Sequence, residues 1–405
     1  MKHALLLLAL FFAFVAGLPA HPSQSKQSNK ASKSFKLPDS HTSTRKSDPP
    51  FKAHGKPKND HFKVKHHHDH GRLHDPHSPW HVKRDLPNIC SIGHRTFWFF
   101  DDTFAYSSDG TFVGAASNSF SIAASIDEPS NVTDISITNA GDVTVAIPWF
   151  SKEAKVQYLS TRYALWSFAP CIPVDDHHAA QIWGVIKFDS RTNHSTIGYS
   201  VSTYEYDEDG NSLSITREQE IDISIDSFAY GGFSSIVVNS VIYLYALDVK
   251  HGRHDIHVAQ VPRSSYADKS TWQYWDNGLQ EWKSTEPNGS ERQEDKAVIT
   301  NSLPFSSGSV FFSEYHNSYL LVFFSFWADS KFYALSAPSP LGPWNVSNSV
   351  IYHTKPGENG YNYGGQASPL FTSSDEPIGK KLVLSYTYQD TTSEWYPKTE
   401  TIEFE

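Results

Sequence analysis

Aspartate residues recur directly after short aromatic segments of the chain, and they are the first candidates for chemistry. The positions are Asp101 with Asp102, Asp189, Asp248, Asp329 and Asp390. Carboxyl groups gathered on one surface can act as a pair, with one as proton donor and the other as base or nucleophile, which is the requirement of glycoside hydrolysis. An aspartate at the start of a loop also caps turns, so each position taken alone has a purely structural explanation as well.

The segments that precede these aspartates have the composition of β-strands. Runs rich in Val, Ile, Tyr, Phe and Trp recur after residue 85 and are broken by Gly, Asn, Asp and Pro, whereas amphipathic helical stretches are scarce. Five copies of one unit can be aligned, each with a short strand, a tight turn and a long aromatic strand; the clearest spans 234–261. A unit of about 64 residues accommodates a four-stranded blade. We therefore predict an all-β fold, a five-bladed β-propeller over 85–405, rather than a two-sheet sandwich, with the aspartates on one face.

Two segments precede that domain. Residues 1–20 combine Lys2, an apolar run and small residues up to Ala20. This pattern predicts a secretory signal peptide rather than a membrane anchor. Residues 21–84 show no helical or strand period, so we expect a disordered His-rich linker or pro-segment there. The segment ends in Lys83-Arg84, a pair of the kind that kexin-like proteases cut, which predicts a mature chain starting at Asp85.

The charge of the chain is distributed unevenly. Of its 34 Lys and Arg and 44 Asp and Glu, 14 basic and 5 acidic residues lie in 21–84 and one basic residue lies in 1–20. Residues 85–405 therefore hold 19 basic and 39 acidic residues, a net charge of −20. Such a surface repels nucleic acid and anionic lipid, so we expect neither nucleic acid nor membrane as a partner. A neutral or cationic ligand fits better than an acidic polysaccharide held without specificity.

The chain has two cysteines, Cys90 and Cys171. In an oxidising compartment we expect them to form a disulfide, the alternative being two separate buried thiols. Four N-x-[ST] sequons predict glycosylation at solvent-facing positions: Asn131, Asn193, Asn288 and Asn345.

Four stretches together resemble a known family. They lie at 93–103, 269–276, 336–344 and 360–370, and include TFWFFDDT and APSPLGPW. They are similar to the five-bladed propeller proteins of the domain-of-unknown-function 4185 family and its fungal relatives, which are close in architecture to family-43 glycosidases. The resemblance implies a hydrolase of furanose-containing polymers. The family ends its first aromatic strand in Gly-Asp-Thr, where this chain has Asp101-Asp102-Thr103, and an Arg-Asp pair of the family matches Arg84-Asp85.

The candidate site follows from the residues and the resemblance together. Asp102 is the first choice for a catalytic carboxyl, with Asp85, Asp248 or Asp329 as its partner; Glu314 is more simply explained as a turn carboxylate. We expect the substrate to be bound by side chains on the same face: Asp101, Trp166, Tyr361, Tyr363 and Gln366. Aromatic rings with an amide at a pocket mouth suit the stacking and hydroxyl recognition of sugars.

Other chemistries have weaker support. His66, His67, His68 and His70 could hold a metal, but such a tract is more often a solvated linker. No nucleotide-binding glycine motif or esterase elbow occurs in the sequence, so we expect no cofactor and no metal. The sequence thus predicts a secreted, extracellular monomer that hydrolyses a cell-wall or plant-wall polysaccharide. The alternative is a non-catalytic carbohydrate-binding or host-interaction propeller.

Overall fold

The computed structural model describes most of the chain from residue 62 onward and one short segment before it. The described residues are 30–38, 62–93, 95–156, 162–190, 193–207, 209–249, 254–291, 293–300, 303–326, 329–347, 350–358, 360–373, 375–390 and 394–405. Among them, helix is confined to α2 (Ser151–Ala154) and the short 3-10 helices η2 (Arg263–Ser265), η3 (Lys269–Thr271) and η4 (Glu294–Lys296). No helix in this part of the chain is long and apolar enough to cross a bilayer. The predicted all-β class is confirmed.

Five antiparallel sheets follow one another along the chain, and we number them one to five. Sheet one contains β4 (Asn88–Ile92), β5 (Arg95–Phe100), β8 (Ser119–Ala123) and β9 (Val132–Asp134). Sheet two contains β10 (Arg162–Trp166), β11 (Ile172–Pro173), β12 (His178–Phe188), β13 (His194–Tyr206), β14 (Ser212–Arg217) and β15 (Ile223–Ser224), with β1 (Ala31–Lys36) at its edge.

The remaining sheets are built in the same way. Sheet three contains β16 (Ser234–Val238), β17 (Val241–Asp248), β18 (Asp255–Pro262), β19 (Gln273–Asp276) and β20 (Glu281–Lys283). Sheet four contains β21 (Phe305–Ser313), β22 (Ser318–Ser325), β23 (Lys331–Ala337) and β24 (Val350–His353). Sheet five contains β25 (Tyr363–Ser368), β26 (Lys381–Gln389), β27 (Trp395–Phe404) and β2 (Val64–Arg72). A small extra sheet of β3 (His81–Arg84), β6 (Thr103–Tyr106) and β7 (Phe112–Ala116) lies beside sheet one.

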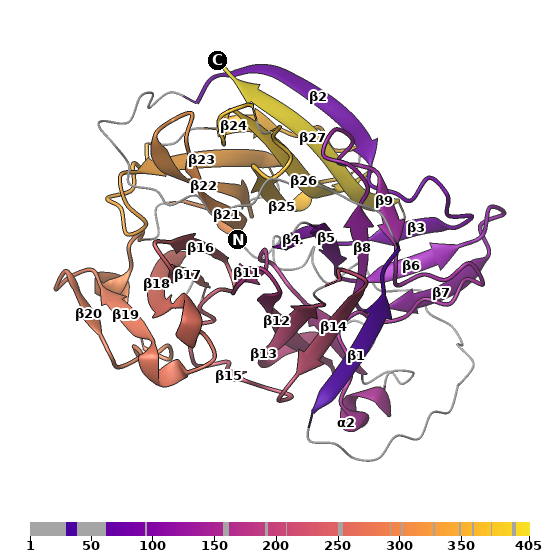
Figure 1. Ribbon diagram of the computed structural model, residues 1–405, viewed down its shortest axis with the longest axis horizontal. Coiled ribbons are helices and arrows are strands. Elements are labelled where there is room, and N and C mark those ends of the chain that lie inside the picture. The colour runs from indigo at the N-terminus through magenta and orange to yellow at the C-terminus, as the bar shows by residue number, and fades with distance from the viewer. Residues whose placement is uncertain are drawn as a thin grey trace.

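The sheets are arranged around a common centre (Figure 1). The first strands contact one another in cyclic order, β4 with β11, β11 with β16, β16 with β21, β21 with β25, and β25 with β4. A closed ring of this kind is the radial arrangement of a propeller. Five of the sheets' aspartates lie at or just after the end of a long strand, since β5, β12, β17, β22 and β26 end at or just before Asp101, Asp189, Asp248, Asp329 and Asp390.

Apolar clusters fill the spaces between neighbouring sheets and explain why the strands lack polar alternation. In β5, Phe97 and Phe99 pack in a cluster with residues of sheet two, whereas Trp98 and Phe100 pack in a cluster with residues of sheet five. Successive side chains of a strand point to opposite faces. All six residues of β5 are buried, because both of its faces are covered by another sheet.

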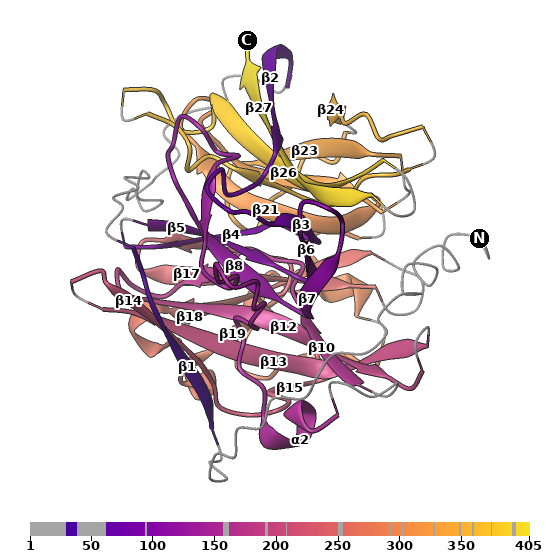
Figure 2. The same cartoon turned by 90° about the vertical axis from the view of Figure 1, so that its right-hand side faces the viewer.

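The N-terminal strands correct the domain boundary that the sequence suggested. β2 pairs with β27 along its length, and the two lie together at the outer edge of the molecule in both views (Figures 1 and 2). β3 pairs with β6, and β1 pairs with β14. The prediction of disorder is therefore wrong for 30–38 and 62–84, because these polar segments gain their hydrogen bonds from strands distant in sequence. The predicted signal peptide at 1–20 and the rest of the segment at 21–84 lie outside the described residues.

Candidate active site

Backbone hydrogen bonds bring Asp85 to the pair Asp101 and Asp102. β3 ends at Arg84, which lies opposite Thr103, the first residue of β6. Just beyond this pairing, the N–H of Asp85 donates to the carbonyl of Asp102 at 3.1 Å, and the N–H of Asp101 donates to the carbonyl of Asp85 at 3.0 Å. Three carboxyl groups therefore gather where the chain leaves β5 and enters β6.

Asp101 and Asp102 are both directed toward sheet two. Oδ1 of Asp101 accepts the backbone N–H of Ser167 at 2.9 Å, and Oδ1 of Asp102 accepts the indole N–H of Trp166 at 3.2 Å. Their Oδ2 atoms are buried with no hydrogen-bond partner. The exposed fractions of the two residues are 1% and 5%, whereas Asp85 is partly exposed. Asp85 is thus the most accessible carboxyl of the cluster.

The environment raises the pKa of both Asp85 and Asp102. Although Asp85 keeps some accessible surface, burial of its carboxyl and then the charge of Asp102 raise its pKa to about 7, against the hydrogen bond from Tyr363. Burial raises the pKa of Asp102 to about 6, against the hydrogen bond from Trp166 and the charge of Arg162. The charge of Asp102 acts in addition to burial on Asp85, which favours a proton on Asp85 while Asp102 is ionised.

Asp101 has a different character. Burial raises its pKa well above the usual value, the Ser167 N–H opposes this, and the charges of Asp102 and Asp85 add to the rise. A neutral carboxylic acid that is almost completely buried can orient its neighbours but has no open surface for a sugar. The expected role of Asp101 in contacting substrate does not fit this location.

Two tyrosines from sheet five form one wall of the cluster. The phenol of Tyr363 donates to Oδ1 of Asp85 at 2.5 Å, and its ring centroid lies 5.7 Å from that of Tyr361. The charge of Asp85 contributes to the raised pKa of both phenols, after burial. The structure therefore brings together six of the predicted site residues: Asp85, Asp101, Asp102, Trp166, Tyr361 and Tyr363.

The backbone after Asp85 is strained and closely packed. Leu86 has a φ of 47° although it is not glycine, and its N–H donates to Oγ1 of Thr387 at 2.9 Å. Gly364 has a φ of 63°, and a Cβ on it would lie only 1.7 Å from Cδ2 of Leu86. Strained backbone of this kind is common at functional sites, where the surrounding structure fixes it. Here it fixes the carboxyl of Asp85 against sheet five.

A group on sheet two completes the other wall, and apart from Trp166 its members were not predicted from the sequence. Arg162 lies opposite Phe188 in the β10–β12 pair, and Phe188 lies opposite His194 in the β12–β13 pair. The guanidinium carbon of Arg162 lies 4.1 Å from the Phe188 ring centroid, and the ring of Trp166 lies 5.5 Å from that of His194. No motif marks these residues, since the register of three strands creates the group.

Three other acidic candidates have partners away from the cluster. Asp329 accepts the phenol of Tyr333 at 3.2 Å and pairs with Lys331 at 3.5 Å. Asp248 is buried at the end of β17. Its charge affects Tyr199 and His254. Glu314 accepts the N–H of Ile378 at 2.8 Å, as a turn carboxylate does. No recorded contact joins any of the three to Asp102 among the described residues.

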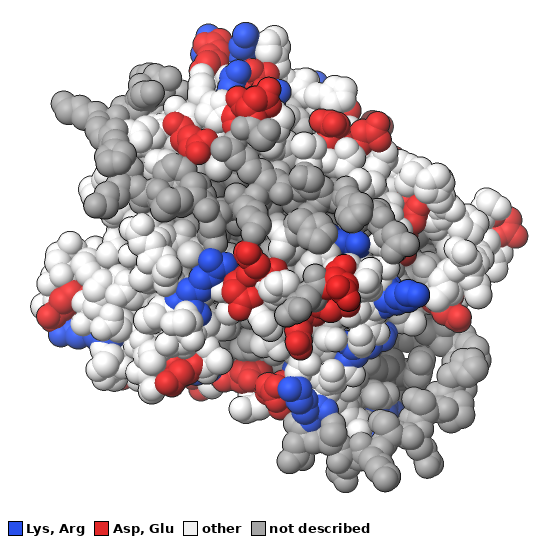
Figure 3. Space-filling model, viewed as in Figure 1, with Lys and Arg blue, Asp and Glu red and all other residues white. Residues whose placement is uncertain are grey.

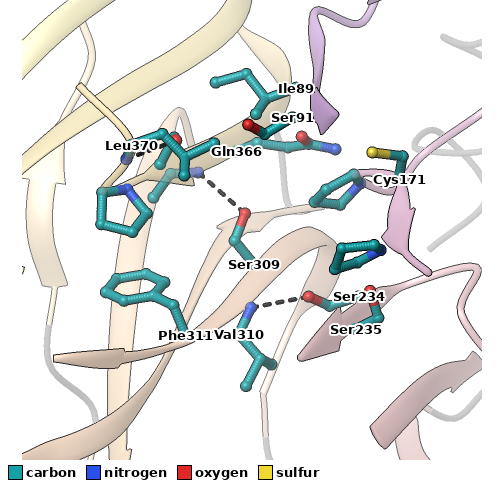
Figure 4. A pocket seen from close by; sticks show the side chains of 15 residues that line it. Ile89, Ser91, Cys171, Ser234, Ser235, Ser309, Val310, Phe311, Gln366 and Leu370 are labelled. Carbon is teal, nitrogen blue, oxygen red and sulfur yellow. Dashed lines mark hydrogen bonds between the residues drawn. The ribbon is translucent and has the colours of Figure 1, made fainter. Parts of the chain in front are cut away.

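Gln366 lies in the inner strand rather than at a pocket mouth. It is buried, and its Nε2 donates to Oδ1 of Asn88 at 2.6 Å. Together with serines of several inner strands it lines a cavity of about 110 Å³ (Figure 4). The residues that line this cavity do not include Asp85, Asp101 or Asp102. The expectation for Gln366 as a sugar ligand is therefore not supported by its position.

The predicted disulfide is present. Cys90 of β4 bonds to Cys171 beside β11, across 81 residues of sequence, and ties the inner strands of sheets one and two together. In the chain-entropy model a loop of this length contributes about 4 kcal/mol to stability. Of the sequon residues, Asn193, Asn288 and Asn345 are exposed and Asn131 is partly exposed.

The histidine tract is part of β2. The rings of His68 and His70 lie 4.5 Å apart, and Nε2 of His70 lies 2.7 Å from Oγ1 of Thr401. Within the described part of the chain, no three His, Cys, Asp or Glu side chains are grouped so that they could hold a metal ion.

Comparison with known proteins identifies the family of this domain. The family model described as domain of unknown function DUF5005 matches residues 91–400. The chain belongs to the DUF5005 family. The motif resemblance had pointed instead to the domain-of-unknown-function 4185 family. Among curated protein sequences, none matches the chain. The DUF5005 match begins inside β4, so β2, β3 and Asp85 precede the matched region.

One solved structure shares the fold at low sequence identity, and two further solved structures are less similar. A candidate hydrolase from Bacteroides ovatus ATCC 8483 is 14% identical, with a TM-score of 0.59 over 80% of this chain and 86% of that one. A family 117 glycoside hydrolase from Zobellia galactanivorans is 10% identical, with a TM-score of 0.46 over 85% and 91% of the two chains. The catalytic domain of the GH62 α-L-arabinofuranosidase from Coprinopsis cinerea is 13% identical, with a TM-score of 0.40 over 84% and 98%.

Proposed function

We propose that this DUF5005 protein is a glycoside hydrolase in which Asp85 and Asp102 are the catalytic carboxyl groups. The observation that carries the proposal is their juxtaposition by backbone hydrogen bonds, with pKa values of about 7 and about 6. Glycoside hydrolysis needs one carboxylic acid and one carboxylate at the same pH. The electrostatics of this pair favour that combination, with the proton on Asp85 and the charge on Asp102.

The accessible position of Asp85 suits it to the role of general acid. Its proton goes to the glycosidic oxygen as the bond from that oxygen to the anomeric carbon breaks. Asp102 supplies the attack on the anomeric carbon in one of two ways. As a base it takes a proton from a water molecule that attacks the carbon, and as a nucleophile it attacks the carbon itself and forms a glycosyl ester, which water later hydrolyses. The neutral carboxyl of Asp101 holds the Ser167 backbone and so positions the strand that carries Trp166.

The aromatic walls support a sugar as the ligand. Trp166, Tyr361 and Tyr363 are partly exposed and come from two sheets on either side of the carboxyl cluster. Such rings stack on the apolar faces of sugars while their polar atoms meet hydroxyl groups. We propose a wall polysaccharide as substrate, furanoside-containing as the sequence resemblance implied.

One observation favours a second function, the binding of a glycan without cleavage. Asp102 is only 5% exposed and its Oδ2 is buried, a location that restricts the approach of an anomeric carbon. A propeller that binds a glycan without cleaving it would tolerate this burial. The aromatic walls would then bind the glycan, and the carboxyl cluster would only hold the surrounding backbone in place.

The cellular setting is proposed from the sequence. The signal-peptide pattern at 1–20 supports secretion. The sequons are all at least partly exposed, and the disulfide agrees with an oxidising compartment. We propose an extracellular glycoprotein that works as a five-bladed monomer.

Substitution by asparagine tests the proposal, because the amide keeps the shape of the carboxyl but cannot exchange the proton. Asp102→Asn and Asp85→Asn should each lower hydrolysis of a wall-polysaccharide panel, including arabinofuranosyl substrates, by at least about a hundredfold. Melting temperatures should stay within a few degrees. Asp189→Asn is the matched control, since Asp189 follows β12 of sheet two but is exposed and pairs with Lys187.

Each outcome discriminates between the two functions. Full activity of Asp102→Asn would exclude the proposed site. A wild-type protein that binds a glycan on the panel but cleaves none would establish the non-catalytic function instead.

A further inference from the structure

Arg162 lies in β10, the strand that carries Trp166, whose indole N–H donates to Asp102. Two buried arginines of the domain have an acidic partner: Arg84 pairs with Asp134 at 2.7 Å, and Arg217 pairs with Glu153 at 2.7 Å. The guanidinium of Arg162 instead stacks on Phe188. Within the described residues no carboxylate forms an ion pair with it.

The strand geometry places Arg162 on the same wall as Trp166. Residues 162 and 166 lie on one face of β10, since side chains two and four positions apart in a strand share a face. Trp166 reaches across to Asp102 through its indole N–H. Arg162 is partly exposed, and the ring of His194 lies 5.0 Å from that of Phe188.

The chemistry of this wall favours an anion. The charge of Arg162 lowers the pKa of Asp102, and burial together with the same charge lowers the pKa of His194, so that histidine is kept neutral. A guanidinium that stacks on an aromatic ring can still donate through its N–H groups, and their fork matches a carboxylate in a two-point contact. A neutral sugar offers only hydroxyl groups to the same fork.

We propose that Arg162 forms a carboxylate-binding subsite beside Asp102, and that the glycan bound there carries an isolated uronic acid. This inference rests on the proposed function for the sugar site, and it specifies the class of sugar. The net charge of −20 over 85–405 argues against a polyanionic chain. On the face in Figure 3, the acidic and basic side chains of the described residues are interspersed. One cation in such surroundings selects one carboxylate on an otherwise neutral glycan.

Binding measured without turnover tests the inference. The Asp102→Asn protein is titrated calorimetrically with oligosaccharides from several uronic-acid-bearing wall glycans, each before and after its carboxyl is reduced to a hydroxymethyl group. We expect at least one pair in which the acidic form binds about tenfold more tightly, the scale of one charge-assisted contact. Polygalacturonate should bind more weakly than this oligosaccharide.

Variants then assign the preference to Arg162. In the same background, Arg162→Gln should remove the difference between acidic and reduced forms, and Arg162→Lys should retain part of it because the charge remains. Lys187→Gln is the control: it removes a cation from the neighbouring strand, but Lys187 pairs with Tyr163, which lies on the other face of β10. This variant should keep the full preference.

Several results would overturn the inference. They are equal binding of every acidic and reduced pair, an unchanged preference in Arg162→Gln, or an equal loss in Lys187→Gln. Failure of the hydrolase proposal would give a different experimental result. The wild type would then cleave nothing while the Arg162-dependent preference persisted.

Discussion

The phenol of Tyr363 donates a 2.5 Å hydrogen bond to Oδ1 of Asp85, and 278 residues of sequence separate the two. The bond joins the last sheet to the segment that precedes the first. It also favours the ionised form of Asp85, against the burial and the Asp102 charge that raise its pKa to about 7. The same hydrogen bond therefore joins the last sheet to the segment before the first sheet and influences the pKa of the proposed proton donor.

Removal of this phenol should move the alkaline limb of the pH profile. Tyr363→Phe takes away a hydrogen bond that stabilises the carboxylate, so the pKa of Asp85 should rise further above 7. If Asp85 must be protonated, activity should then persist to higher pH. The measurement is kcat/KM against pH for both proteins, and an alkaline limb that stays in place or moves down would contradict the role of Asp85 as acid.

Trp166→Phe should act on the other limb. The indole N–H stabilises the ionised form of Asp102, so its loss should raise the pKa of Asp102 above about 6. The acid limb of kcat/KM should move to higher pH while the alkaline limb changes little, which narrows the active range. An acid limb unchanged in Trp166→Phe would show that Asp102 is not the group that must be ionised.

Gly364→Ala should damage the site and the fold together. The new Cβ would overlap Leu86, the residue after Asp85, at a φ that only glycine adopts readily. We expect a loss of about 1–3 kcal/mol in unfolding free energy, as for overpacked positions, and at least a tenfold loss of activity. Gly110→Ala is the control, since Gly110 has a φ of 83° with open space around it. Equal effects in both variants would mean that contact with Leu86 is unimportant.

Part of this site could be predicted from the sequence and part could not. Aromatic strands followed by aspartates identified Asp101 and Asp102, because a strand buried on both faces needs apolar residues at every position. The same pattern gave no means of separating them from Asp248 or Asp329. Asp101 and Asp102 differ from those aspartates because β3 places Asp85 beside them, at the end of β5 in sheet one. Arg162 and His194 could not be found, because their proximity depends on strand register.

The histidine tract shows the same limit for the fold. β2 reads VKHHHDHGR and is largely exposed, so it carries no apolar period. An edge strand obtains its stability from backbone hydrogen bonds to a partner, here β27, and not from burying its own side chains. The residues of β2 alone do not identify a partner strand more than 300 residues away.

Removal of the N-terminal strands should destabilise the domain. A chain that begins at Asp85 lacks β2 and β3 and leaves the buried carboxylate of Asp134 without Arg84, a loss of about 3–5 kcal/mol for a broken buried pair. A chain that begins at Phe62 keeps both strands and should melt well above the shorter one. Equal melting temperatures, or a secreted protein found by N-terminal sequencing to begin at Asp85, would support processing at Lys83-Arg84. Both of those residues are buried in β3.

His257 should make the domain sensitive to acid. Its imidazole is buried against Phe228, both ring nitrogens lack hydrogen-bond partners, and burial lowers its pKa to about 4. As pH falls from 6.5 to 4, the unfolded chain gains a proton that the folded chain does not, so stability falls. His257→Phe removes this cost, and its stability relative to wild type should grow by up to about 3 kcal/mol over that range. The comparison with wild type is needed because the raised pKa values of the buried carboxyl groups make stability rise as pH falls. The measurement is denaturant unfolding of both proteins at several pH values. A difference in unfolding free energy that stays constant with pH would contradict the assignment.

The pairing of β2 with β27 has a consequence for how the chain is made. A ribosome releases β2 more than 300 residues before β27, so β2 stays unpaired until that intervening length of chain has been made. Contacts this distant in sequence slow folding and leave strand edges open to other chains in the meantime. Lysine and histidine residues along β2 are unfavourable in edge-to-edge aggregates. The polar composition of β2, which resembles that of a linker, is therefore suited to a strand that stays unpaired until β27 has been synthesised.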